Sequence, residues 1–61
     1  MITLPEIGDE VVCVRPVGRL EKDRRYVVAD KRRTGRTWFI EVEGLPGSWW
    51  DVGRFTEVRG G

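Results

Sequence analysis

The chain has 61 residues, of which 11 are basic and 10 acidic, so it is a small domain whose charges nearly cancel. It has no His and a single Cys, Cys13, which excludes a Ser/His/Asp or Cys/His catalytic set and a zinc site built from several such ligands. So small a core leaves few residues for a deep catalytic pocket. We therefore expect a non-enzymatic protein without metal or cofactor, and the lone Cys favours a reducing, cytoplasmic setting.

Membrane contact is not expected either. No apolar run approaches the roughly 20 residues of a membrane helix. The first residues also lack the basic start and the long apolar stretch of a signal peptide.

Short segments rich in β-branched and aromatic residues, separated by eight Gly and three Pro, predict an all-β fold. The first strand is expected over 10–14, after a turn at residues 8–9, and its apolar residues predict that both of its faces are covered. A polar loop over 15–24 follows, in which Leu20 is expected to close one end of the core. Cys13 is expected to be buried as a small apolar residue.

The second strand is expected over 25–29, and residues 31–36 are expected to form a basic hairpin tip. Gly35 would supply the positive φ that a tight turn requires. The third strand, over 37–43, alternates strictly between two faces. The residues predicted to face the core are Trp38, Ile40 and Val42, and those predicted to face solvent are Phe39, Glu41 and Glu43.

The last predicted elements are a tight turn over 44–47, a strand over 48–52, a break over 53–55 and a strand over 56–58. In the fourth strand Trp50 and Val52 share one face, and Trp49 lies on the other. This order of strands and connections predicts a small five-stranded SH3-like barrel. We expect one domain over 1–61, with its core over about 7–58.

A resemblance to a known group is carried by four segments: GDEVVCV (8–14), YVV (26–28), WDVGRF (50–55) and EV (57–58). They resemble small SH3-like-barrel proteins of bacteriophages and prophages, most of which have no assigned activity. The resemblance implies an intracellular accessory protein. It also implies that Phe55 plugs the core, that Trp50 packs beside it and that Arg54 lies outward.

The basic run Lys31-Arg32-Arg33-Thr34-Gly35-Arg36 is the first candidate for partner contact. Planar guanidinium groups suit phosphate oxygens, so the run is a candidate phosphate-contacting finger. The alternative is a solvated turn. A net charge near zero weighs against non-specific nucleic-acid binding, which depends on a strong positive field.

The second candidate is the aromatic pair Phe39 and Trp49, both predicted on the solvent face. Such residues anchor protein partners or stack on bases. The alternative is that the 15–24 loop covers them in a second small core. We therefore expect a binding module for a protein partner, with nucleic-acid binding and a structural domain of unknown function as alternatives. The candidate contact residues are Lys31, Arg32, Arg33, Arg36, Phe39, Trp49 and Arg54.

Overall fold

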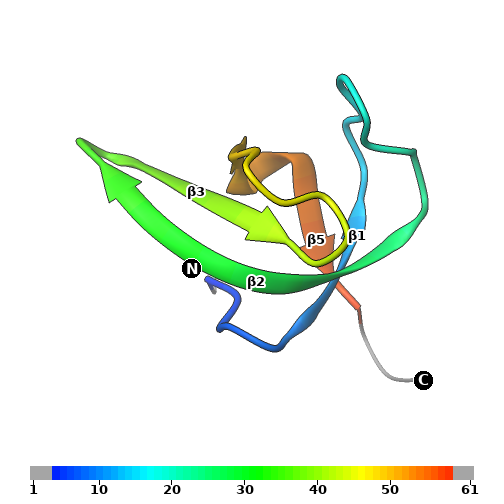
Figure 1. The fold of residues 1–61 in the computed structure, drawn as a ribbon, viewed down its shortest axis with the longest axis horizontal. Coiled ribbons are helices and arrows are strands. Elements are labelled where there is room, and N and C mark those ends of the chain that lie inside the picture. Colours follow the sequence, from blue (N-terminus) through cyan, green and yellow to red (C-terminus); the bar gives the residue numbers. More distant parts are fainter. Residues whose placement is uncertain (1–3, 59–61) are drawn as a thin grey trace.

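Five antiparallel strands make up the fold in the computed structural model, which describes residues 4–58 (Figure 1). The elements are β1 (Glu10–Cys13), β2 (Arg25–Thr34), β3 (Thr37–Val42), β4 (Trp50–Asp51), the 3-10 turn η1 (Val52–Arg54) and β5 (Phe55–Glu57). They form one sheet in the order β4-β3-β2-β1-β5. The first half of β2 pairs with β1 and its second half with β3. This arrangement confirms the predicted all-β, SH3-like fold.

One apolar cluster forms the core of the fold. Its members are Val11, Cys13, Leu20, Tyr26, Val28, Ile40, Val42, Trp50 and Phe55. Leu20 comes from the long loop and is only 4% exposed, and the Cys13 thiol is fully buried, as predicted. No helix within residues 4–58 is long and apolar enough to cross a membrane.

The prediction that β1 is covered on both faces is wrong. Val11 and Cys13 face the core, whereas Val12 is only half-buried and Val14, just past the strand, is 39% exposed. The reason is that β1 lies between β2 and β5 in a single sheet, and an antiparallel sheet of this kind needs only one face against the core.

The strand β2 continues well past its predicted end at residue 29. Val28 pairs with Val42 but Asp30 pairs with Glu41, so Ala29 has no partner of its own and forms a β-bulge. The bulge shifts the alternation of side chains by one residue. Simple alternation from Val28 would therefore assign each side chain of residues 30–34 to the wrong face of the sheet.

The hairpin between β2 and β3 is longer and its turn shorter than predicted. Residues 31–34 belong to β2, and the turn consists of Gly35 and Arg36 between the paired residues Thr34 and Thr37. Gly35 has φ 63°, which confirms its predicted role in the turn. Figure 1 shows this hairpin reaching away from the rest of the fold.

The strand predicted over 48–52 is confined to β4, because the chain turns immediately afterwards. The Asp51 carboxylate accepts a hydrogen bond from the Gly53 N–H at 2.7 Å and caps η1. The turn delivers Phe55 into the core, opposite Cys13. There its ring meets Tyr26 edge to face, with centroids 6.2 Å apart. The predicted core positions of Phe55 and Trp50 are thereby confirmed.

Candidate interaction surface

The basic run 31–36 is divided between the two faces of the β2–β3 hairpin. We call the face that carries the buried Ile40 the inner face. Lys31 pairs with Ile40 and Arg33 pairs with Trp38 on this face, whereas Arg32 pairs with Phe39 on the outer face. Arg36 lies in the turn. The expected hairpin tip over 31–36 is therefore too long, because residues 31–34 alternate as a strand and only Gly35 and Arg36 form the turn.

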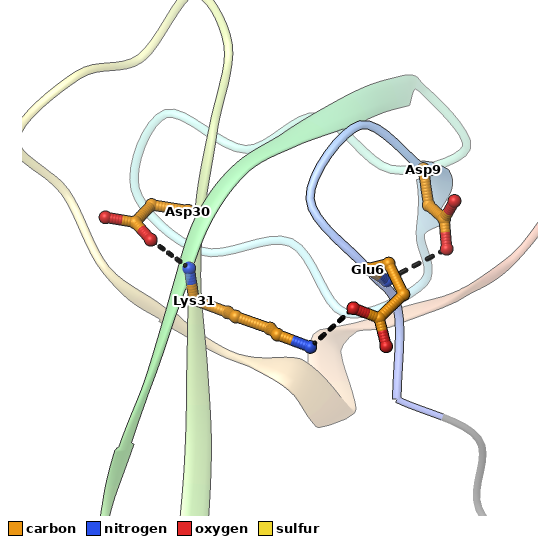
Figure 2. Close-up of polar contacts among 4 residues, drawn as sticks. All are labelled: Glu6, Asp9, Asp30 and Lys31. Carbon is orange, nitrogen blue, oxygen red and sulfur yellow. Dashed lines mark hydrogen bonds and ion pairs between the residues drawn. The ribbon is translucent and has the colours of Figure 1, made fainter.

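Lys31 is engaged within the fold. Its side chain is only 24% exposed, and its Nζ lies 3.0 Å from Glu6 Oε2 (Figure 2). The same Nζ lies 5.7 Å from the centre of the Trp38 ring. Asp9 in turn accepts a hydrogen bond from the Glu6 N–H at 2.9 Å. The aliphatic part of Lys31 covers the core beside Ile40 while its ammonium reaches the surface. Lys31 thus adds an ion pair with Glu6, while the segment around Glu6 is joined to the sheet by backbone hydrogen bonds from the Gly8 N–H to the Val28 carbonyl oxygen and from the Val28 N–H to the Asp9 carbonyl oxygen.

Arg32 joins the two aromatic residues of the outer face. Its Cζ lies 5.3 Å from the centre of the Trp49 ring, which is a cation–π distance. In the sheet, Arg32 pairs with Phe39, which pairs on its other side with Asp51. Phe39 and Trp49 are both half-buried. We call the group Arg32, Phe39, Trp49 and Asp51 the outer surface.

Carboxylates flank this surface and are themselves held in place. Glu41 lies beside Phe39 along the same strand and pairs with Asp30. Its Oε2 accepts a hydrogen bond from the Gly47 N–H at 2.7 Å. The outer surface therefore presents fixed charges of both signs around its aromatic side chains.

The loop between β1 and β2 does not cover the outer surface. The N–H groups of Val14 and Arg15 both donate to the Arg54 carbonyl oxygen, at 2.8 and 3.2 Å, which places the start of the loop against η1. Figure 1 shows the loop at the opposite end of the fold from the hairpin turn. Arg54 is half-buried there, and its Nη1 donates to the Arg15 carbonyl oxygen at 3.3 Å. Arg54 thus anchors the loop, instead of extending freely outward.

Sequence reasoning placed Trp38 in the core, but the structure makes it part of a second surface. Trp38 does lie on the inner face, yet it is only half-buried, because it lies near the hairpin turn beyond the main cluster. It lines a groove of about 430 Å³ between the hairpin, η1 and the N-terminal segment. The residues of the groove are Leu4, Arg36, Thr37, Trp38, Asp51 and Val52. No local pattern connects Leu4 with residues so distant in the sequence.

In comparisons with known proteins, no protein-family model, curated protein or solved structure matches the chain. Within residues 4–58, no three His, Cys, Asp or Glu side chains are grouped in a way that could hold a metal ion. The outer surface and the groove are the features of the described chain from which partner chemistry can be inferred.

Proposed function

We propose that this chain is a non-enzymatic binding module that contacts a protein partner through the outer surface. The observation that carries the proposal is the Arg32 guanidinium stacked over Trp49 beside Phe39. Trp and Arg are the residue types most enriched among the hot spots of protein interfaces. Side chains that are already half-buried and held by neighbours also lose less conformational freedom on binding.

The charges around the outer surface favour a protein over a nucleic acid. A phosphate backbone placed along Arg32 and Phe39 would also meet the carboxylates of Glu41 and Asp51, which lie on the same face. Arg32 already occupies one face of the Trp49 ring, and bases bind by stacking on open aromatic faces. A protein interface accommodates both charge signs around an aromatic centre.

The proposal includes a cytoplasmic setting and an accessory role in a bacteriophage or prophage. The resemblance of segments 8–14 and 50–55 supports this role. The buried thiol of Cys13 has no partner Cys in the chain, so the fold does not depend on an oxidising compartment.

The test compares Trp49 with an exposed side chain of the β1–β2 loop that belongs to neither surface. A protein captured by the immobilised chain is purified and titrated against the wild type, Trp49→Ala and Val17→Ala. A hot spot costs 2 kcal/mol or more, so we expect Trp49→Ala to weaken binding by about 30-fold or more. Val17 is 43% exposed, and Val17→Ala should bind within about three-fold of the wild type. Binding of Trp49→Ala within about three-fold of the wild type would refute the outer surface as the contact.

A parallel titration tests the nucleic-acid alternative. Labelled single- and double-stranded oligonucleotides are followed by anisotropy at low and at moderate salt. We expect no saturable binding. Saturable binding that weakens steeply with salt and is lost in Arg32→Ser would replace the protein proposal with nucleic-acid binding.

A further inference from the structure

The groove on the inner side of the hairpin end has an apolar floor. This floor consists of Leu4 from the N-terminal segment, Trp38 from β3 and Val52 from η1. Trp38 and Val52 are only partly buried, so they retain apolar surface exposed to solvent. The volume of about 430 Å³ lies in the lower part of the ~300–1,000 Å³ range of ligand pockets. It has room for one or two apolar side chains of a partner.

The charged groups around this floor leave an excess of positive charge. Lys31 is paired with Glu6, so their charges cancel, and the Asp51 carboxylate keeps its negative charge while accepting a hydrogen bond from the Gly53 N–H. The two cations Arg33 and Arg36 against the one carboxylate of Asp51 leave an excess of one positive charge. Within residues 4–58, neither Arg33 nor Arg36 forms an ion pair with a carboxylate.

Both arginines belong to the end of the hairpin. Arg33 lies opposite Trp38, and its Nε donates to the Gly35 carbonyl oxygen at 2.8 Å, which fixes its guanidinium at the turn. Arg36 occupies the next turn position and lines the groove. Arg36 therefore lines the apolar hollow directly, and Arg33 lies across the hairpin from Trp38 of the groove.

A second hollow, of about 330 Å³ beneath the β1–β2 loop, lacks this excess. Two of the arginines that line it, Arg24 and Arg25, are paired with Glu21 and Glu10, and the other two charged residues, Arg19 and Glu43, have opposite charges. No net charge therefore remains around it, which distinguishes the groove from it.

We propose that this groove is a second binding site, which shares only Asp51 with the outer surface, and that it takes an acidic peptide segment. An apolar side chain of the segment lies against Trp38 and Val52, and flanking Asp or Glu carboxylates reach Arg33 and Arg36. Arginine suits this task because its planar fork matches a carboxylate with two parallel hydrogen bonds. The arginines thus favour a segment with acidic residues, and the apolar floor favours an apolar side chain at its centre.

A nucleic acid fits this groove less well than an acidic peptide. The Lys31 ammonium covers one face of the Trp38 ring at 5.7 Å, and the rest of the floor is aliphatic. Bases therefore find little open aromatic surface on which to stack.

The test uses a short acetylated and amidated peptide in which a Leu-Phe pair is flanked by glutamates. Peptides of the same length with glutamines or with lysines in place of the glutamates are the ligand controls. Binding is followed on the ¹⁵N-labelled full chain by NMR, at the Trp38 indole and at the amides of Thr37 and Val52. A single-stranded oligonucleotide is titrated in the same way.

Two protein variants accompany the wild type. Arg36→Ser removes a groove cation, and Arg19→Ser removes an exposed cation from the β1–β2 loop as the matched control. Both leave the core untouched, and the NMR spectrum reports at once whether the fold is intact. We expect Arg36→Ser to weaken binding of the glutamate peptide about five-fold, which is near the upper limit of the free energy of an exposed ion pair. We expect Arg19→Ser to leave the affinity for this peptide unchanged.

The expected result is a set of saturable shifts at the groove with the glutamate peptide, absent with the lysine peptide and weaker with the glutamine peptide. No shifts up to about 1 mM peptide would overturn the proposal. It would equally be overturned by equal losses in the two Arg variants, by shifts centred on Trp49 and Phe39, or by tighter binding of the oligonucleotide. None of these results depends on the outer surface finding its own partner.

Discussion

Replacing Phe55 with Ala is expected to leave the domain close to its unfolding threshold. The Phe55 side chain is 8% exposed, packs edge to face on Tyr26 and pairs in register with Cys13. Truncating such a side chain costs about 3–5 kcal/mol, because the lost contacts and the cavity add together. A chain of 61 residues at about 0.05–0.15 kcal/mol per residue has a free energy of unfolding of about 3–9 kcal/mol. One substitution therefore removes a third of it or more.

The measurement is thermal and urea unfolding of the wild type, Phe55→Ala and the control Val17→Ala. Val17 is 43% exposed, so its truncation should change the free energy of unfolding by no more than about 0.5 kcal/mol. For a domain of this size, a loss of 3 kcal/mol corresponds to a fall in Tm of about 12 °C or more. A cooperative Phe55→Ala transition within about 4 °C of the wild type would show that Phe55 is not the plug of the core.

Two further substitutions, one thiol-reactivity measurement and one pH series test other properties of the fold. Gly35→Ala should destabilise by about 1 kcal/mol or more, because φ 63° disfavours a side chain; an unchanged urea midpoint would contradict the turn geometry. Glu6→Gln should cost under about 1 kcal/mol and lose its effect at high salt, since Glu6 is 73% exposed while bound to Lys31. The fully buried Cys13 thiol should react with a disulfide reagent only as fast as the domain opens, so immediate reaction would contradict its burial. Because the chain has no His, we expect the free energy of unfolding to vary by less than about 1 kcal/mol between about pH 6 and 8 in urea titrations.

The sequence was sufficient for the central part of β3, where apolar and polar residues alternate, and for the turn before it. Alternation along β3 correctly predicts Ile40 and Val42 inside and Phe39 outside, because a strand fixes its side-chain period at two residues. Gly35 marks the hairpin turn for an equally local reason, its tolerance of positive φ. Such features depend only on neighbouring residues and the geometry of the backbone.

Two of the features that could not be predicted depend on contacts between distant segments, and a third depends on a local side-chain contact. The course of the β1–β2 loop is set by hydrogen bonds from Val14 and Arg15 to Arg54, about 40 residues later in the chain. The groove brings Leu4 and Val52 together in the same way. The end of β4 depends on the Asp51 side chain binding the Gly53 N–H, a local event that strand alternation does not reveal.

The bulge at Ala29 determines how the hairpin uses its basic residues. With uninterrupted alternation from Val28, Arg32 would lie on the core face and Lys31 on the outer face. The additional residue reverses both positions, so the lysine stem covers the core and binds Glu6, and the arginine stacks on Trp49. Each side chain suits the place it receives, because a flexible lysine snorkels well and a planar guanidinium stacks well on an indole. The same bulge leaves Arg33 on the inner face beside the groove, so one irregular residue provides cations for both proposed surfaces.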